Sequence, residues 1–351
     1  MTYEEKWMKR SLQLAANGIG RAAPNPLVGC VITHNDLIIG EGFHQLFGGR
    51  HAEVNALNSV QDRSLLCKST LYVNLEPCAH FGKTPPCSQL IIDKKIPRVV
   101  IGTSDPNPIV SGKGIAQLKA AGIVVIIDVL AEECKRLNKR FFTFHEQKRP
   151  YIILKWAKSE DGYIDLPRDN NETGIRCVTG SESNRFSHLW RSQEQAILVG
   201  KTTVLNDNPS LTTRKVEGKN PIRIVLDRNF AIPLKSSILN EEARTILVHD
   251  KKRTPFHPYK NTISTLGIDY SGDVLSQLLN ELYNQNIQSV IVEGGSFTLQ
   301  QFIDAGLWDE ARVFTGEHTF RKGIAAPILS SFSVTGSNEY GNDKLEYFVK
   351  S

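Results

Sequence analysis

One histidine, one glutamate and two cysteines near the start of the chain have the types and spacing of a catalytic metal site. His51 and Glu53 are one residue apart, Cys78 follows Pro77, and eight residues separate Cys78 from Cys87. One imidazole and two thiolates are preferred zinc ligands, and three protein ligands leave a fourth position for water. Zinc lowers the pKa of that water, and a carboxylate close to a ligand can carry its proton to a leaving amine. The residues therefore predict Glu53 as the acid–base group of a site that holds one zinc ion per chain through His51, Cys78 and Cys87.

This arrangement resembles the signature of the zinc-dependent nucleobase and nucleotide deaminases, in which a His-x-Glu motif precedes Pro-Cys and a second cysteine. Those enzymes commonly have two residues between the cysteines, whereas here the eight residues AHFGKTPP intervene. The longer insertion is similar to that of the pyrimidine deaminases of riboflavin biosynthesis, as are the segments APNPLVG at 23–29 and GFH at 42–44. The resemblance implies a phosphorylated pyrimidine as the small-molecule substrate, contacted by Asn25, His44, His80, Lys83 and Thr84.

Other interpretations of these residues stay open. The two cysteines could be structural thiols, or they could belong to a structural zinc site with His44 or His80 as its fourth ligand. The chain could also be another nucleotide or RNA deaminase with an accessory or inactive reductase-like domain, or a zinc module fused to an interaction domain. Glu53 argues against a purely structural site, because such a site needs no acid–base group. The long insertion between the cysteines argues against an RNA deaminase.

Three segments in the second half of the chain resemble the NADPH-dependent reductases of riboflavin biosynthesis. They are LKWAKSEDG at 154–162, GKTTVLNDNPSLTTR at 200–214 and VIVEGGS at 290–296. In the third segment a strand runs into two glycines and a helix, where backbone N–H groups favour a phosphate and glycine allows its close approach. The resemblance implies NADPH contacts from Ala157, Thr203, Asp207, Gly295, Ser296 and Phe297. It also implies a substrate site, with an arginine fork suited to phosphate, made by Lys155, Arg191, Leu211, Arg214 and Glu293.

One segment departs from the reductase pattern. After Thr173-Gly174, the chain has Ile175-Arg176-Cys177 where that family often has Ser-x-Trp. A hydroxyl that would reach the substrate and an indole that would stack on the cofactor are therefore replaced. We expect the local contacts of the reductase to differ here, while the identity of the domain is unaffected.

The elements that must position these residues alternate between helical and strand patterns. The first part predicts a hairpin at 27–33 and 37–43, strands at 70–75, 98–102 and 123–127, and helices at 4–17, 52–60, 87–95, 115–121 and about 130–145. The second part predicts strands at 151–157, 196–199, 222–226, 245–249 and 289–292, and helices at 181–192, 273–285 and 296–304. Such alternation is typical of α/β layers with parallel strands.

The segment Lys148-Arg149-Pro150 is polar, ends in proline and precedes a new strand, so it predicts a domain boundary. We therefore expect a zinc-dependent pyrimidine deaminase domain at 1–147 and an NADPH-dependent reductase domain at 148–351. By resemblance, the first is a cytidine-deaminase-like α/β/α domain and the second a dihydrofolate-reductase-like α/β domain. The implied reactions are removal of a 2-amino group from the pyrimidine and reduction of its ribosyl group to a ribityl chain.

Composition excludes several other classes. The 351 residues are 40% hydrophobic and 23% charged, with a formal net charge of +5, as in ordinary globular proteins. No run approaches the ~20 apolar residues of a membrane span, and basic residues are not clustered as in nucleic-acid binders. The N-terminus has no signal-peptide pattern, so six cysteines are more readily explained by a reducing cytoplasm than by disulfides. We expect a cytoplasmic enzyme without membrane or nucleic-acid partners, and a homo-oligomer, as enzymes of this type often are.

Overall fold

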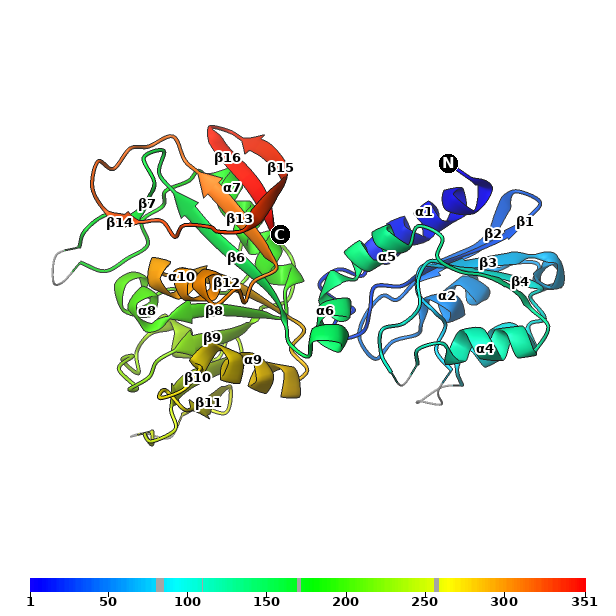
Figure 1. Ribbon diagram of the computed structural model, residues 1–351, viewed down its shortest axis with the longest axis horizontal. Coiled ribbons are helices and arrows are strands. Elements are labelled where there is room, and N and C mark those ends of the chain that lie inside the picture. The colour runs from blue at the N-terminus through cyan, green and yellow to red at the C-terminus, as the bar shows by residue number, and fades with distance from the viewer. Residues whose placement is uncertain (80–84, 109, 169–171, 256–258) are drawn as a thin grey trace. The chain divides into compact units, whose positions relative to one another are not determined.

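The computed structural model describes residues 1–79, 85–108, 110–168, 172–255 and 259–351. These residues form two compact units, Met1–Lys148 and Arg149–Ser351, called below the N-terminal and the C-terminal unit (Figure 1). Lys148 adopts a left-handed backbone conformation with φ 57° and ends the last helix of the N-terminal unit. The first strand of the C-terminal unit begins three residues later, at Tyr151.

The N-terminal unit is built on a five-stranded sheet in the order β2-β1-β3-β4-β5. β1 pairs antiparallel with β2 and β3, whereas β3, β4 and β5 are parallel. The strands are β1 (Gly29–His34), β2 (Leu37–Phe43), β3 (Thr70–Val73), β4 (Arg98–Ile101) and β5 (Val124–Ile126). The helices are α1 (Tyr3–Ala16), α2 (Ala52–Ser59), α3 (Cys87–Asp93), α4 (Lys113–Ala120), α5 (Ala131–Leu137) and α6 (Lys139–Gln147), with a 3-10 turn η1 (Arg63–Lys68).

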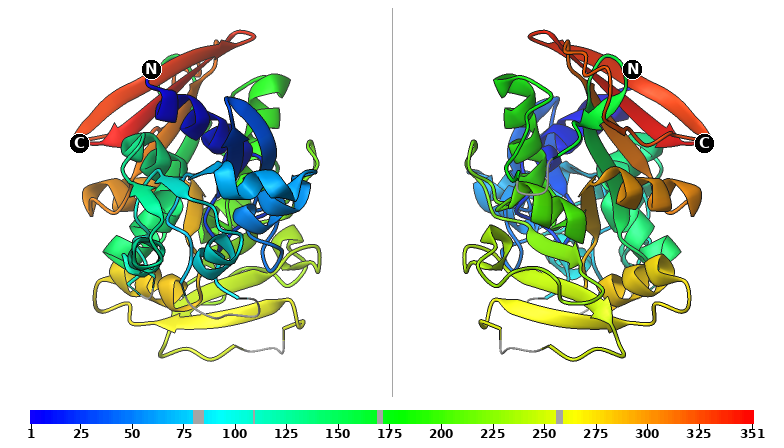
Figure 2. Two further views of the ribbon diagram at one scale, coloured as in Figure 1. Left: turned by 90° about the vertical axis from the view of Figure 1, so that its right-hand side faces the viewer. Right: turned by 90° about the vertical axis from the view of Figure 1, so that its left-hand side faces the viewer.

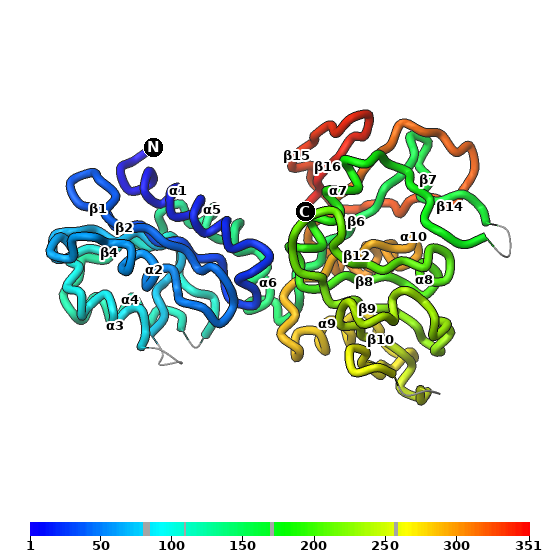
Figure 3. The backbone as a smooth tube through the Cα atoms, turned by 180° about the vertical axis from the view of Figure 1, so that it is seen from behind, coloured from blue at the N-terminus to red at the C-terminus, as the bar shows by residue number. Residues whose placement is uncertain are grey.

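Helices cover both faces of this sheet, because successive strand residues point to opposite sides. Ile32 of β1 packs with Leu118 of α4 and with residues of α2 and α3 on one face. The neighbouring Val31 packs with Met8 of α1 and Cys134 of α5 on the other. Figure 3 shows α1 and α5 on one side of the sheet and α2 and α4 on the other. The α/β/α arrangement expected for the first half is confirmed.

The single helix expected at about 130–145 is instead two helices, α5 and α6, which meet at Asn138. The Asn138 side chain accepts a hydrogen bond from the Leu27 N–H (2.7 Å) and donates one to the Leu27 carbonyl (2.9 Å). Asparagine side chains that bond to backbone groups compete with helix continuation. The partner of Asn138 lies 111 residues away, so the local pattern gives no sign of this break.

The C-terminal unit contains a nine-stranded sheet in the order β11-β10-β9-β8-β12-β6-β13-β16-β15, and a short sheet of β14 and β7. The larger sheet is parallel from β11 to β13, and β16 and β15 add antiparallel strands at one edge. The strands are β6 (Tyr151–Lys158), β7 (Tyr163–Asp165), β8 (Ala196–Gly200), β9 (Ile222–Leu226), β10 (Thr245–Asp250), β11 (Ile263–Ile268), β12 (Ser289–Gly294), β13 (Glu310–Thr315), β14 (Ile324–Ala325), β15 (Phe332–Tyr340) and β16 (Asp343–Lys350). The helices are α7 (Ser181–Gln193), α8 (Lys201–Asp207), α9 (Val274–Asn284) and α10 (Ser296–Asp304), with a 3-10 turn η2 (Ser237–Leu239).

Helices also cover both faces of the larger sheet. Leu278 of α9 and Phe302 of α10 belong to one core cluster, and Trp190 of α7 and Val204 of α8 belong to another. Figure 2 shows the β15–β16 hairpin and the β10–β11 pair at opposite edges of the sheet. The α/β class expected for the second half is confirmed, but the strands β7, β11 and β13–β16 and the helix α8 were not predicted. β15 is exposed along most of its length, so it lacks the apolar alternation that marks a strand.

Among the helices of the described ranges, none combines the length and apolar character needed to cross a membrane. In the C-terminal unit, β6, β8, β9 and β12 are parallel, so their carboxyl ends reach the same edge of the sheet. In open α/β sheets this edge is where ligands bind.

Candidate zinc site and cofactor cleft

Three donor atoms in the N-terminal unit converge as a metal site requires. His51 directly precedes α2, Cys87 is the first residue of α3, and Cys78 lies in the turn that follows β3. His51 Nδ1 is 3.6 Å from Cys78 Sγ and 3.3 Å from Cys87 Sγ, and all three donor atoms lie within 4.8 Å of one another. Tetrahedral zinc with ordinary Zn–N and Zn–S bonds would separate such donors by about 3.6 Å. The geometry and the donor types both fit zinc.

Glu53 lies in the first turn of α2 and is 3% exposed. Burial raises the pKa of its carboxyl group, and the charge of Cys78 adds to this effect. A carboxyl group whose pKa is raised toward neutrality can both accept and donate a proton during one reaction. The structure therefore brings the three predicted ligands together and places the buried Glu53 carboxyl group two residues from one of them.

His44 is buried beside this site, with its ring at 5.7 Å and 85° from the ring of His51. Its Nδ1 lies 3.0 Å from the Arg50 carbonyl, and its Nε2 lies 3.0 Å from Asn25 Nδ2. These partners assign the proton to Nδ1 and make Nε2 an acceptor, a neutral form that burial also favours by lowering the pKa of His44. Both ring nitrogens are engaged, so His44 is not a fourth metal ligand.

The loop that carries Asn25 is fixed by two buried asparagines that the sequence analysis missed. Asn74 Nδ2 donates to the Leu27 carbonyl (3.0 Å), and Asn138 bonds to both backbone groups of Leu27. The remaining residues predicted to contact the deaminase substrate lie outside the described part of the chain, namely His80, Lys83 and Thr84.

Glu76, two residues before a metal ligand, is a second residue that the sequence analysis missed. Its carboxylate is 4% exposed and accepts four backbone N–H groups, from Asp105 (3.2 Å), Gly112 (3.0 Å), Gly114 (2.9 Å) and Ile115 (3.2 Å). Three of these donors lie at the start of α4, where unpaired N–H groups and the helix dipole favour an anion. Glu76 thereby fastens α4 and its preceding loop against the turn that carries Cys78.

We expect Glu76→Gln to weaken zinc binding about tenfold, because an amide nitrogen accepts no hydrogen bond and would oppose two of the four donors. Competition with a chromogenic chelator measures this affinity. Glu133→Gln, at an exposed position of α5, is the matched control and should bind zinc as the wild type does. Unchanged zinc affinity in Glu76→Gln would show that the turn holds its shape without this carboxylate.

The C-terminal unit has a cleft of about 840 Å³ at the carboxyl ends of its parallel strands. Among the described residues, eight lysine or arginine side chains and three carboxylates line it, an excess of positive charge that suits phosphorylated ligands. The cleft brings together every residue predicted for NADPH and for the reductase substrate: Lys155, Ala157, Arg191, Thr203, Asp207, Leu211, Arg214, Glu293, Gly295, Ser296 and Phe297.

Three charged groups meet on adjacent elements in this cleft. Arg191 of α7 makes a two-point ion pair with Glu293 of β12, with N–O distances of 2.9 and 2.6 Å. Burial would raise the pKa of Glu293, but Arg191 and Lys155 outweigh it and lower that pKa to about 2. Burial lowers the pKa of Lys155, and Glu293 opposes that shift. Because Arg191 uses only two of its five N–H donors on Glu293, it keeps donors for a ligand.

His188, one helical turn before Arg191, is a cleft residue that the sequence analysis missed. It is 2% exposed, and its Nδ1 lies 3.1 Å from the backbone nitrogen of Arg214. The Arg214 N–H can donate only to an unprotonated nitrogen, so this bond requires neutral His188 with its proton on Nε2. Burial lowers the pKa of His188 to about 4, and the positive charges of Arg191 and Arg214 contribute.

We expect the pKa of the His188 imidazole to be about 4, well below that of an ordinary histidine. Because the folded protein disfavours the charged form, the unfolded chain binds more protons between pH 6.5 and 4, and stability falls as pH is lowered through this range. Two-dimensional NMR of the histidine Cε1–H groups, with His188→Gln to assign the signal, measures the pKa. A midpoint near 6.5 would contradict the hydrogen bond to Arg214.

The segment that departs from the reductase pattern forms part of the cleft wall. Ile175, Arg176 and Cys177 all line the cleft. Ile175 is 61% exposed, so its aliphatic side chain is not needed for the core. Here the wall offers an aliphatic group, a guanidinium and a thiol.

Two family profiles match the chain. The cytidine and deoxycytidylate deaminase zinc-binding region matches residues 1–103, and the RibD C-terminal domain matches residues 150–317. The first covers all three zinc ligands and Glu53, and the second covers every predicted cleft residue.

Curated relatives and solved structures agree with these profiles over nearly the full chain. The riboflavin biosynthesis protein RibD of Aquifex aeolicus is 39% identical over 98% of this chain and 95% of its own, and that of Escherichia coli is 36% identical over 89% and 87%. The Thermotoga maritima diaminohydroxyphosphoribosylaminopyrimidine deaminase/5-amino-6-(5-phosphoribosylamino)uracil reductase superposes with a TM-score of 0.89 at 38% identity, covering 99% of both chains. Acinetobacter baumannii RibD gives a TM-score of 0.87 at 30% identity, also covering 99% of both chains. The chain therefore belongs to the RibD family, whose zinc-dependent deaminase and NADPH-dependent reductase act in riboflavin biosynthesis, and it is a bifunctional enzyme of that family.

Proposed function

We propose that the N-terminal unit hydrolyses the 2-amino group of 2,5-diamino-6-ribosylamino-4(3H)-pyrimidinone 5′-phosphate. We also propose that the C-terminal unit reduces the ribosyl group of that product to a ribityl chain with NADPH. The observation that carries the first assignment is the convergence of His51, Cys78 and Cys87 beside the buried carboxyl group of Glu53. The two reactions named for the Thermotoga maritima protein support the choice of substrate.

For the deamination, His51, Cys78 and Cys87 would hold the zinc ion, whose chemistry is to make water nucleophilic near neutral pH. Glu53 takes the proton released from that water and delivers it to the departing amine. Asn25, in the loop before β1, and His44, directly after β2, orient the pyrimidine. The contacts proposed for His80, Lys83 and Thr84 rest on the family resemblance of their segment.

For the reduction, the chemistry that NADPH supplies is hydride donation to C1′ of the sugar. The proposed cofactor contacts come from the carboxyl ends of β6, β8 and β12 and the helices that follow, namely Ala157, Thr203, Asp207, Gly295, Ser296 and Phe297. Arg191 and Arg214 bind the substrate phosphate, and Lys155, Leu211 and Glu293 orient the sugar. The excess of basic side chains in the cleft supports two phosphorylated ligands.

Incubation of the zinc-loaded protein with the diaminopyrimidinone phosphate, with and without NADPH, tests both halves. Ammonia release without NADPH, followed by an equal amount of NADPH oxidation once it is added, is the expected result. Ammonia without oxidation would contradict the reductase assignment. Absence of ammonia release would contradict the proposed deaminase substrate.

A homo-oligomer is the assembly that we propose. β15 forms the outer edge of the larger sheet, and its Phe332 and Val334 are 41% and 57% exposed. An edge strand with exposed apolar side chains favours association with another chain. Light scattering coupled to size-exclusion chromatography gives the mass, and a value near the 39.2 kDa of one chain would contradict the proposal.

A further inference from the structure

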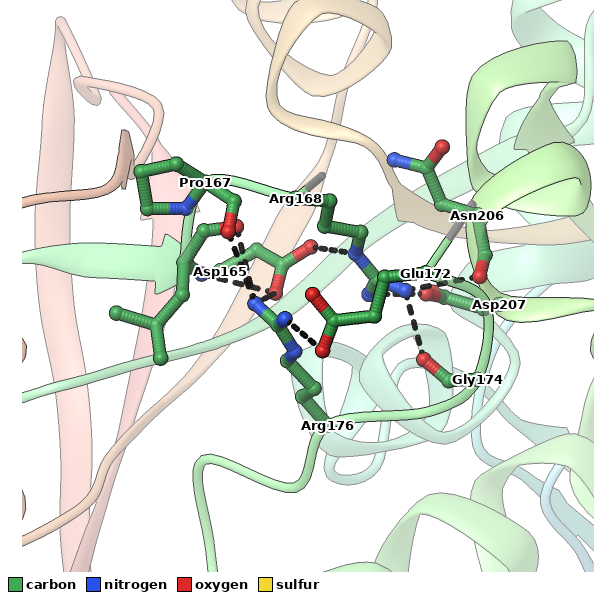
Figure 4. A network of polar contacts seen from close by, with 9 residues as sticks. Asp165, Pro167, Arg168, Glu172, Gly174, Arg176, Asn206 and Asp207 are labelled. Carbon is green, nitrogen blue, oxygen red and sulfur yellow. Dashed lines mark hydrogen bonds and ion pairs between the residues drawn. The ribbon is translucent and has the colours of Figure 1, made fainter. Parts of the chain in front are cut away.

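One guanidinium at the cleft joins three separate segments of the C-terminal unit. Arg168 Nε donates to Asp165 (2.8 Å), one terminal nitrogen donates to Asp207 (2.6 Å), and the other donates to the carbonyls of Gly174 and Asn206 (both 2.8 Å) (Figure 4). The Arg168 side chain is 9% exposed, and it lines the cleft together with Asp165 and Asp207. Arg168 thus links the end of β7, the end of α8 and the segment that follows residue 171.

Asp207 needs this partner because of its place in α8. It is the last residue of the helix, where unpaired carbonyl groups carry partial negative charge and disfavour a carboxylate. Arg168 donates both to the Asp207 carboxylate and to the neighbouring Asn206 carbonyl, and the Gly174 N–H donates to that same carbonyl (2.8 Å). The Arg168 guanidinium therefore offsets the negative charge of the Asp207 carboxylate and of the carbonyl groups at the end of α8. Its bond to the Gly174 carbonyl also holds Gly174 against the end of that helix.

Asp165 and Asp207 also repel each other. Burial raises the pKa of Asp207, Arg168 opposes this, and the nearby charge of Asp165 raises the pKa further. Arg168 bonds to both carboxylates at once, so its positive charge offsets the repulsion between them beside the cleft. Without that guanidinium, two partly buried like charges would face each other.

The segment that departs from the reductase pattern is tied to the same place. Arg176 donates to the carbonyls of Leu166 and Pro167 (both 3.3 Å), which directly precede Arg168. It also forms an ion pair with Glu172 and lies 3.7 Å from Asp165 (Figure 4). Polar bonds between described residues therefore shape this wall, in the region where the reductase family often has a serine and a tryptophan.

We propose that Arg168 is a positioning residue for NADPH, which holds Asp207 and the wall at 172–177 in the geometry that binds the cofactor. The inference rests on the proposed function, because that function assigns the cleft and Asp207 to NADPH. Four of the five Arg168 donors are used on protein groups, so Arg168 acts through Asp207 and does not bind a cofactor phosphate itself.

The test is NADPH binding by the Arg168→Met variant. The Kd is measured by titrating the protein with NADPH and recording its tryptophan fluorescence. We expect the Kd to rise about tenfold and the KM for NADPH to rise with it, while kcat at saturating NADPH stays within about twofold. Arg168→Lys keeps the charge but not the fork and should give an intermediate Kd. Adding Asp165→Asn to Arg168→Met removes the repulsion and should recover part of the affinity.

Arg149→Met is the matched control, because Arg149 also forms a mostly buried ion pair, with Asp309 at 2.6 Å, and neither residue lines the cleft. Its Kd for NADPH should equal that of the wild type, and ammonia release should be unchanged in both variants. Wild-type affinity in Arg168→Met, or in Arg168→Lys if the methionine variant fails to fold, would overturn the inference. Wild-type protein that binds no NADPH would instead overturn the cofactor assignment, and this inference with it.

Discussion

The Glu53→Gln variant is expected to retain zinc and to release ammonia from the pyrimidine substrate roughly 10²- to 10⁴-fold more slowly than the wild type. The carboxyl group is buried in the first turn of α2, two residues from His51, so the substitution keeps the shape of the side chain and removes its ability to carry a proton. Zinc content by mass spectrometry and ammonia release by a coupled assay are measured on the same preparation.

The reductase of that preparation is an internal control for the Glu53→Gln result. Given the deaminated intermediate directly, the variant should oxidise NADPH at the wild-type rate, because Glu53 and the cleft lie in different compact units. Ammonia release at the wild-type rate would rule out Glu53 as the acid–base group. If ammonia release fell only in proportion to the zinc content of the variant, Glu53 would be needed for metal binding and not for proton transfer.

The Glu293→Gln variant is expected to lose about 3 kcal/mol of the free energy of unfolding of the C-terminal unit at neutral pH. The substitution leaves Arg191 and Lys155 as buried cations without a compensating anion. Reductase turnover should fall as well, since both cations line the cleft. Urea unfolding followed by tryptophan fluorescence reports mainly on this unit, which contains Trp156, Trp190 and Trp308.

The same ion pair predicts a pH dependence. The folded pKa of Glu293 is about 2, below the 4.5 of an ordinary glutamate, so the unfolded chain binds more protons between these values. The contribution of ionised Glu293 to the free energy of unfolding is therefore complete above about pH 4.5 and is lost as the pH falls toward 2. The stability difference between wild type and Glu293→Gln should shrink over that interval. Glu339→Gln, at an exposed position of β15, is the control, and a difference that does not change with pH would contradict the assigned pKa.

The residues that could be predicted from sequence are those whose chemistry depends on local spacing. His51 directly precedes α2 and Glu53 lies in its first turn, while Glu293 and Gly294 end β12, so the residues of each pattern remain neighbours in the folded protein. All predicted cleft residues meet in one cavity because parallel strands bring their carboxyl ends to one edge.

The residues that were not predicted form hydrogen bonds with backbone groups far away in the chain. Glu76 accepts N–H groups 29 to 39 residues later, His188 accepts one 26 residues later, and Asn138 binds a residue 111 positions earlier. No local pattern encodes such a partner, because any buried polar side chain could find one in many places. The same limit hid the break between α5 and α6.

The two hydrogen bonds between Asn138 and Leu27 limit where the chain could be divided to place the two activities on different polypeptides. The zinc-binding profile ends at residue 103, yet the folded unit depends on what comes after it. Cys134 fills the core beneath α1, and Phe141 and Phe142 pack on Leu75. A fragment cut at residue 103 would contain all three zinc ligands and Asn74, but it would lack Asn138, the second asparagine that holds the loop carrying Asn25. We therefore expect the smallest autonomous deaminase to extend to the end of α6, well past the last residue proposed to take part in its chemistry.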